Sequence, residues 1–198
     1  NFFVFSFSMS GDDLSQWRSY TPDGGVSIGF SIRDLWDSFE GRTIGYKNDI
    51  HIKESDGFRI FMGACKYVEN VADVSNLDVR FHHNDVEKTE NIYDFLSTVL
   101  FWKQKEFRHE NEYRIVFSPF LEDGARQIKQ IGNKPRSAIP FRQGHYVNDS
   151  IRRIVISPHG NGERIANNVR ALFLSYKVPK DVCVEHSKIP YIADEKQG

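Results

Sequence analysis

The sequence has few cysteines, no long apolar run and almost no net charge. Cys65 and Cys183 are the only cysteines among 198 residues and have no paired spacing, which argues against a disulfide framework and favours a cytosolic location. No stretch of about 20 apolar residues occurs, so we expect no membrane-spanning helix and no membrane partner. The formal net charge of −1 argues against a general nucleic-acid coat protein, although it leaves room for a local basic patch.

Several motifs of common enzyme classes are missing too. There is no His-Glu-x-x-His or Cys-x-x-Cys motif, so His82 and His83, with Asp85 and Glu87 nearby, fit a solvated surface better than a metal site. We therefore predict no metal cofactor. A Gly-x-Ser-x-Gly motif is also absent, which argues against a serine nucleophile. The loop at 157–162 lacks the Walker lysine, so an ordinary connecting loop is favoured over a phosphate site.

The composition is that of a globular protein with a core. Hydrophobic residues make up 39%, charged residues 27% and aromatic residues 14% of the chain. The length suits a single domain, which we place at residues 1–193, with a frayed tail at 194–198. The chain starts at Asn1, inside an alternating apolar run without the features of a signal peptide. We therefore expect that an N-terminal segment of the full protein is missing.

Apolar spacing predicts a mixture of strands and helices. Period-two alternation or apolar runs predict strands at residues 3–8, 26–30, 44–52, 60–68, 111–118, 151–157 and 181–186. A spacing near 3.6 residues predicts helices at 92–106 and 163–176, and polar residues 10–13 can cap a third helix that starts at Leu14. Residues 126–140 are basic and rich in turn formers. The pattern predicts an α+β fold in which strands outnumber helices.

Two carboxylates and a guanidinium form the sharpest local feature. Glu110, Glu112 and Arg114 alternate at the start of a predicted strand, so their side chains point to one face. An adjacent guanidinium keeps a carboxylate pair ionised, and such a trio can orient a hydroxyl group or stabilise a positively charged transition state. A charge ladder on a solvated strand edge explains the same pattern equally well.

Two hydroxyl groups and two aromatic residues form a second candidate group. Ser6 and Ser8 share one face of the first predicted strand, and Trp17 and Tyr20 follow in the next helix. These side chains could bind a ribose and a flat ring. Taken alone, the pattern is more often found by chance, and a tryptophan at helical spacing is usually a core residue.

Several stretches of the chain together carry a resemblance to a known family. They are residues 5–8, 12–20, 25–30, 107 with 110–116, 151–158 and 187–191. In this order they resemble a bacterial family known as domain of unknown function twenty-nine seventy-one. One departure is Phe107, where that family usually has tryptophan. The family also has an N-terminal segment that this chain lacks.

A more remote similarity is to ADP-ribosyltransferase-like folds, which bind NAD in a split, mainly antiparallel sheet flanked by helices. Their three signature strands carry an Arg or His, then a Ser-x-Ser or Tyr, and then a Glu-x-Glu. Residues 6–8 and 110–112 resemble the second and third in the required order, and we expect the first strand in the missing N-terminal segment. The similarity implies that Glu112 is the catalytic carboxylate and that Glu110 positions the acceptor. It also implies that NAD is a co-substrate. The residues that it places around NAD are Ser6, Ser8, Trp17, Tyr20 and Arg114.

The resulting leading hypothesis is an NAD-consuming transferase or glycohydrolase that acts as a bacterial toxin or phage-defence effector. Its expected partners are a protein or nucleic-acid acceptor and an antitoxin or other defence-system protein. One alternative is a metal-dependent nuclease, because residues 112–114 also fit an acidic-x-basic core. Another is a non-enzymatic interaction domain that uses a basic surface formed by Arg126, Lys129, Lys134, Arg136, Arg152 and Arg153.

Overall fold

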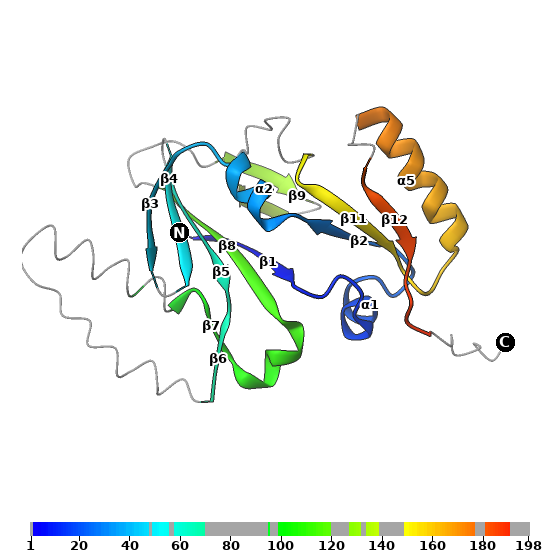
Figure 1. The fold of residues 1–198 in the computed structure, drawn as a ribbon, viewed down its shortest axis with the longest axis horizontal. Coiled ribbons are helices and arrows are strands. Elements are labelled where there is room, and N and C mark those ends of the chain that lie inside the picture. Colours follow the sequence, from blue (N-terminus) through cyan, green and yellow to red (C-terminus); the bar gives the residue numbers. More distant parts are fainter. Residues whose placement is uncertain are drawn as a thin grey trace, which may run out of the picture. The chain divides into compact units, whose positions relative to one another are not determined.

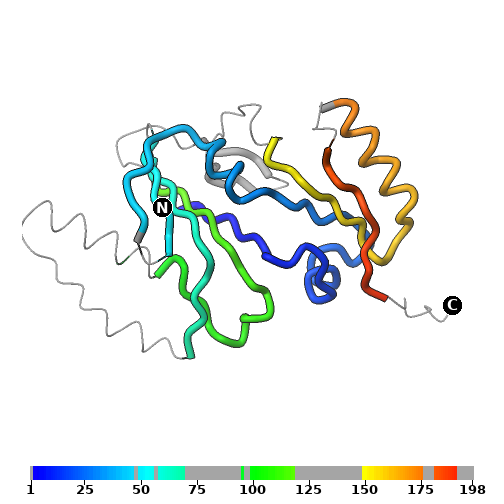
Figure 2. The backbone as a smooth tube through the Cα atoms, in the orientation of Figure 1, coloured from blue at the N-terminus to red at the C-terminus, as the bar shows by residue number. Residues whose placement is uncertain are grey.

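The computed structural model describes residues 2–47, 49–55, 58–69, 95, 99–119, 127–131, 134–138, 149–176 and 181–190. The chain divides into two compact units: the first holds Asn1–Met9 and Glu40–Arg142, and the second holds Ser10–Phe39 and Gln143–Gly198. Figure 2 traces the chain from the first unit into the second, back into the first and finally into the second again. Whether both units act as the one domain expected over residues 1–193 stays a prediction. The expected tail at 194–198 lies outside the described residues.

The first unit is built on a five-stranded antiparallel sheet (Figure 1). The spatial order of its strands is β1-β8-β5-β4-β3, and each neighbouring pair runs antiparallel. Strand β1 therefore lies beside β8, although the other three strands of the sheet come between them in the sequence. The bounds of the strands are β1 Phe3–Ser8, β3 Arg42–Lys47, β4 Ile50–Ser55, β5 Phe58–Ala64 and β8 Glu112–Pro119.

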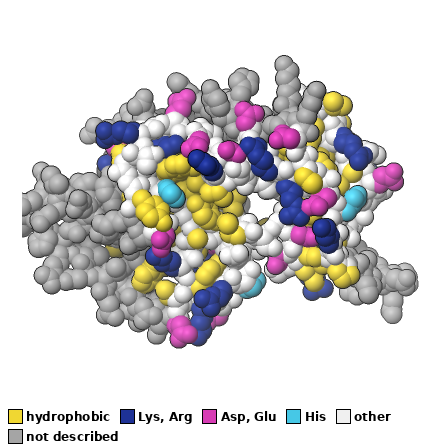
Figure 3. Space-filling view, viewed as in Figure 1, with side chains coloured by type: hydrophobic (Ala, Val, Ile, Leu, Met, Phe, Trp, Pro, Cys, Tyr) yellow, Lys and Arg dark blue, Asp and Glu magenta, His cyan; other side chains and the backbone are white. Residues whose placement is uncertain are grey.

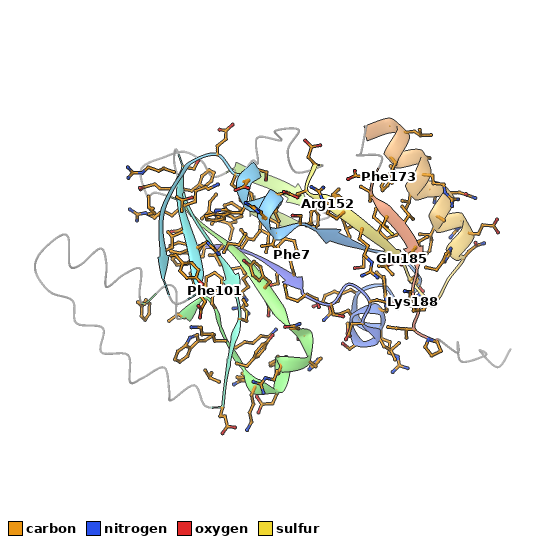
Figure 4. All side chains as sticks on the ribbon, viewed as in Figure 1. Phe7, Phe101, Arg152, Phe173, Glu185 and Lys188 are labelled. Carbon is orange, nitrogen blue, oxygen red and sulfur yellow. The ribbon has the colours of Figure 1, made fainter. Side chains whose placement is uncertain are left out.

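Both faces of the central strands β5 and β8 are buried. On one face, the buried cluster consists of Ile50, Ile52, Phe61, Phe101 and Val116. The ring of Phe101, labelled in Figure 4, comes from the segment just before β7. On the other face, Phe117 makes edge-to-face contacts with Phe5 and Phe58, each with ring centroids 5.9 Å apart. This burial on two sides explains why β5 reads as a continuous apolar run rather than as an alternating one.

Two predicted strands are each divided in the structure. Residues 44–52 do not form one strand: β3 ends at Lys47 and β4 begins at Ile50. Asp49 lies in the turn with φ 67°, a left-handed conformation that aspartate tolerates better than most residues. The strand predicted over 60–68 similarly ends at Ala64, and Lys66–Val68 forms a separate strand, β6. The mainly apolar run of β5 continues through Cys65, so it did not reveal the second break, whereas the three polar residues 47–49 mark the first one.

The helix predicted over residues 92–106 is wrong in its last part. Trp102–Gln104 forms strand β7, and Lys105–Glu110 forms a short 3-10 helix, η2. Strand β7 pairs in parallel with β6, and this pairing places Lys103 opposite Tyr67. A partner strand that comes much earlier in the chain thus overrides the local helical spacing. Most of residues 92–98 lie outside the described part of the chain.

The second unit holds a three-stranded sheet with the order β12-β11-β2. Strand β11 pairs antiparallel with β2 and parallel with β12, and helix α5 connects the two parallel strands. The elements of this unit are α1 Leu14–Tyr20, β2 Val26–Phe30, α2 Ile32–Ser38, β11 Ile151–Ile156, α5 Gly162–Tyr176 and β12 Cys183–His186.

The predictions for the second unit are mostly confirmed. Helix α1 starts at Leu14, and the Asp13 side chain caps it by accepting from the backbone N–H groups of residues 15 and 16. Helix α2 was not predicted, although Ser31 accepts from the N–H of Asp34 in a Ser-x-x-Asp capping pattern that could have revealed it. The helix predicted at 163–176 is confirmed as α5, in which Leu172 is 54% exposed.

The predicted α+β class is confirmed at the level of mixed helices and mainly antiparallel sheets. The basic segment at 126–140 contains an antiparallel hairpin of β9 (Gln127–Ile131) and β10 (Lys134–Ala138). Only the pairs β6–β7 and β11–β12 are parallel among the described strands. Among the described helices, none is long and apolar enough to cross a membrane.

Asp12 links the start of α1 to the residues after β12. Its carboxylate accepts from Trp17 Nε1 at 2.8 Å, Ser187 Oγ at 2.6 Å and the Lys188 backbone N–H at 2.9 Å. We expect Asp12→Ala to lower the free energy of unfolding by about 2 kcal/mol and the melting temperature by about 6 °C, because two segments lose their shared acceptor. Thermal unfolding beside Asp23→Ala, which changes an exposed aspartate, checks this. Equal losses in the two variants would contradict it.

Candidate functional site

The candidate site lies where η2 ends and β8 begins. Glu110 is the last residue of η2, Asn111 adopts a left-handed conformation with φ 44°, and Glu112 is the first residue of β8. The prediction that Glu110 and Glu112 alternate along one strand is therefore wrong, because the chain changes direction at Asn111. The two carboxylates nevertheless come together, through a residue that the sequence did not point to.

That residue is Lys103 on β7. Its ammonium group lies 2.5 Å from Glu110 Oε2 and 2.6 Å from Glu112 Oε2. The two carboxylate oxygens are therefore no farther apart than the sum of these distances. A single ammonium thus neutralises part of the repulsion between two carboxylates. Lys103 was missed because it falls in the segment predicted to be helical, where its side chain has no partner on β8.

Arg114 holds the other side of the Glu112 carboxylate, as its spacing on the strand predicted. Its Nε donates to Glu112 Oε1 at 2.8 Å, and its Nη2 donates to Oε2 at 3.2 Å. Its Nη1 also donates to the Leu100 carbonyl oxygen at 2.6 Å. Because three of its donor atoms are occupied in fixed directions, the guanidinium is locked in place beside the carboxylate.

The backbone of Glu112 is fixed as firmly as its side chain. Its N–H donates to the Tyr67 hydroxyl at 2.7 Å, and its carbonyl accepts from the Cys65 N–H at 2.8 Å. Tyr67 and Lys103 are directly opposite each other in the β6–β7 ladder. This small ladder therefore presents a hydroxyl and an ammonium together to the first residue of β8. Tyr67 is a second site residue that the sequence did not indicate.

Ser6 and Ser8 face this cluster from the neighbouring strand. In the β1–β8 register, Ser6 lies opposite Arg114 and Ser8 lies opposite Glu112. Directly opposed residues of an antiparallel pair extend to the same face of the sheet, so both serines share the face of the carboxylate. Ser8 Oγ donates to the Glu110 carbonyl oxygen at 3.0 Å, which ties the end of η2 to β1.

The electrostatics of the cluster keep Glu112 ionised. Burial of its side chain, which is 5% exposed, acts to raise the pKa of Glu112. Hydrogen bonds from Arg114, Lys103 and Ser6 outweigh this effect and lower the pKa to about 2. For Lys103, burial acts to lower the pKa, but the bonds to the two carboxylates raise it overall. Burial raises the pKa of the nearby Cys65 thiol to about 11, so this thiol stays protonated near neutral pH.

The low pKa of Glu112 predicts a specific form of acid sensitivity. Because the folded-state pKa is below the ordinary value of 4.5, ionised Glu112 stabilises the fold above about pH 4.5, and this contribution is lost as the pH falls through about 2. We expect the stability of the native chain to fall more steeply than that of Glu112→Gln between these values. Urea unfolding of both proteins at about pH 5 and about pH 2.5 measures the difference. Parallel pH profiles would contradict it.

The aromatic candidates belong to the second unit. Trp17 is 3% exposed, and its indole N–H donates to Asp12, so a core position explains this residue fully within its own unit. Tyr20 is 74% exposed at the end of α1. Their expected role in stacking on a flat ring stays a prediction.

The remaining sequence candidates contribute less. The residues 82–87 considered for metal binding lie outside the described residues, and the described ones contain no group of three side chains that could hold a metal ion. In the loop after β11, Ser157 Oγ donates to the His159 carbonyl oxygen and accepts from the Gly25 N–H. These bonds within the unit fit an ordinary connecting loop. Cys65 and Cys183 are both free thiols.

The expected basic surface is only partly described. Arg152 pairs with Asp34 at 2.5 Å, and Arg153 pairs with Glu185. Figure 4 labels Arg152 on β11 and Glu185 on β12. In the space-filling view, Lys and Arg side chains lie among Asp and Glu side chains rather than in one basic region (Figure 3). Side chains of residues 126–138 lie outside the described part, so an interaction surface there stays a prediction.

Comparison with known proteins gives one match. Residues 16–115 match the family described as Protein of unknown function (DUF2971), which confirms the resemblance expected from the sequence. The matched region includes Tyr67, Lys103, Glu110, Glu112 and Arg114, whereas the stretches 151–158 and 187–191 lie outside it. No curated protein and no solved structure matches the chain. Since the match covers half of the sequence, the chain belongs to the DUF2971 family.

Proposed function

We propose that this protein is an NAD-consuming enzyme of the ADP-ribosyltransferase-like type, with Glu112 as its catalytic carboxylate. The observation that carries the proposal is a nearly buried carboxylate, held ionised at the start of a central strand and faced by two serines on the adjacent strand. Burial of an ionised group is costly, and the site offsets this cost with two cations. A carboxylate kept charged in this way is suited to stabilising a positive charge.

The proposed reaction breaks the bond between C1′ of the ribose and the nicotinamide nitrogen. Nicotinamide leaves with the electron pair of that bond, and positive charge develops on the ribose as an oxocarbenium ion. The Glu112 carboxylate accepts a hydrogen bond from the ribose 2′-hydroxyl and stabilises this charge. Water or an acceptor nucleophile then forms the new bond to C1′ and loses a proton. Glu110 positions that nucleophile, because its carboxylate lies beside Glu112 and is more exposed.

The arrangement of strands supports a split-sheet fold of the same type. The Ser-x-Ser segment on β1 lies directly beside the strand that opens with Glu112, in an antiparallel sheet. In this proposal Ser6 braces the carboxylate, Ser8 holds the end of η2, and Arg114 fixes the orientation of Glu112.

The biological role that we propose is that of a bacterial toxin or phage-defence effector. Such an enzyme would consume NAD or modify a protein or nucleic-acid acceptor, and a cognate antitoxin or defence-system protein would restrain it. The support for this role comes from the charged cluster around the buried Glu112 carboxylate, through the chemistry that such a cluster would allow.

The test is release of nicotinamide from NAD by the intact chain, measured beside its Glu112→Gln variant. We expect release that depends on Glu112 and persists with a metal chelator. Activity on nucleic acid that a chelator abolishes would favour the metal-dependent nuclease instead. Absence of both nicotinamide release and an NAD-induced thermal shift would overturn the proposal and leave the interaction-domain alternative.

A further inference from the structure

Lys103 covers the carboxylate that the proposed reaction needs. The exposed fraction of the side chain rises from 5% for Glu112 to 18% for Lys103 and 26% for Glu110. Lys103 therefore lies between the buried carboxylate and the more exposed one. Its ammonium occupies Glu112 Oε2, while Arg114 occupies Oε1 and also reaches Oε2. A ribose hydroxyl can approach Oε2 only when one of these two cations moves.

Of the two cations, Lys103 has the side chain that can move away from Glu112 more easily. Arg114 is a planar donor that is also bonded to the Leu100 carbonyl oxygen, so leaving Glu112 would break a fixed set of three bonds. Lys103 is a point charge on a flexible four-carbon chain. Apart from the two carboxylates, its ammonium has the ring of Phe107 at 4.9 Å from the ring centroid. Phe107 is 42% exposed, so this contact is close to solvent.

A mobile ammonium needs a new anion when it leaves two carboxylates. A diphosphate supplies this, because its oxygens accept charge-assisted hydrogen bonds like those that Lys103 gives up. A nucleoside without phosphate offers no such replacement, so its binding would leave Lys103 with Glu110 as its single carboxylate partner. The chemistry of the site therefore favours a ligand that brings a hydroxyl group and a diphosphate together.

We propose that Lys103 bridges Glu112 and Glu110 until a dinucleotide binds, and that it then turns to the diphosphate of the dinucleotide. This inference rests on the proposed function and adds to it a residue that selects for phosphate. Lys103 thereby has two states. In the first it shields the carboxylate from water, and in the second it holds the substrate while Glu112 Oε2 receives the ribose hydroxyl.

The test uses ADP-ribose, which contains the diphosphate but no nicotinamide, as a probe that the enzyme cannot turn over. We expect Lys103→Met to weaken ADP-ribose binding at least about tenfold in calorimetric titrations, because one charge-assisted bond is lost. The matched control is Lys105→Met, two residues along the chain, where the lysine is half-exposed and pairs with Glu69. This control should bind ADP-ribose like the native chain.

Glu110→Gln is a second variant, and we expect it to strengthen ADP-ribose binding rather than weaken it. It removes one of the two carboxylates that hold Lys103 in the bridging state, so ADP-ribose should bind several-fold more tightly. Damage to the fold cannot produce this gain. In turnover assays Lys103→Met should raise KM for NAD about tenfold, whereas kcat/KM for nicotinamide riboside, which lacks the diphosphate, should not fall.

The outcomes separate this inference from the proposed function. If the native chain releases nicotinamide but Lys103→Met binds ADP-ribose normally, the role of Lys103 is overturned and the enzyme remains. If ADP-ribose binding depends on Lys103 and is strengthened by Glu110→Gln but no nicotinamide is released, the proposed reaction falls and the diphosphate site stands. Equal losses for NAD and nicotinamide riboside would indicate a purely structural lysine and would overturn the inference.

Discussion

Glu112→Gln should reduce nicotinamide release from NAD at least about 100-fold. The amide keeps the size and shape of the carboxylate but carries no charge, so it cannot stabilise the oxocarbenium ion as nicotinamide leaves. Of its two terminal groups, only the oxygen can still accept a hydrogen bond from Arg114 or Lys103. Hydrogen bonds from Arg114, Lys103 and Ser6 hold the pKa of Glu112 at about 2, so the cluster favours the charged form that the amide cannot provide.

The fold should survive this change, because the backbone bonds of Glu112 to Tyr67 and Cys65 do not involve its side chain. Circular dichroism and a cooperative thermal transition check the folded state of the variant. Glu106→Gln is the matched control, since Glu106 is an exposed acid on the same 3-10 helix. It should release nicotinamide at the native rate. Native turnover by Glu112→Gln would sink the proposed mechanism.

Arg114→Met should lower the free energy of unfolding by about 3 kcal/mol at neutral pH. The variant leaves the nearly buried Glu112 carboxylate with Lys103 as its remaining cation, and it leaves the Leu100 carbonyl without its guanidinium donor. Removing one partner of a buried ion pair costs more stability than the intact pair contributes. The reason is that the remaining carboxylate is still buried away from water but has lost a compensating cation.

Urea unfolding at neutral pH measures this loss, and Arg108→Met provides the comparison. Arg108 is an exposed residue of η2 whose side chain should contribute little to stability. The loss in Arg114→Met should also shrink at acid pH, since protonation removes the uncompensated charge. If both arginine variants lost the same small amount of stability, Arg114 would not be the cation that compensates Glu112.

Local signals in the sequence predicted much of the fold. Alternation of apolar residues located β1 and β2, and a short apolar run located β11, because these patterns lie within each strand's own sequence. Asp13 marked the start of α1 through a capping bond that spans only a few residues. The period-two spacing of Glu112 and Arg114 predicted their contact, because both residues lie on β8 and share one face.

The parts of the site that could not be predicted depend on long-range pairing. Lys103 and Tyr67 meet only because β7 pairs with β6, and nothing in the apolar spacing of residues 92–106 distinguishes that outcome from a helix. The position of Glu110 depends on Asn111, whose left-handed conformation turns the chain between η2 and β8. In the sequence, the alternation of charged residues continues past Asn111 into β8, so it did not reveal this turn. Chemistry-bearing residue types were thus recognisable, whereas the lysine that joins them was not.

The order of strands also determines when the site is completed during synthesis. Ser8 and Glu110 are in contact, yet 102 residues separate them in the chain, and the whole β1–β8 ladder has this high contact order. Strand β1 is synthesised before β8 and must wait for it, while all of β3, β4 and β5 is made in between. Nascent chains that stop before Glu112 carry the serines without the carboxylate. The β1–β8 ladder can therefore pair only once β8 has been synthesised, and any activity that needs the serines and the carboxylate together would begin only then.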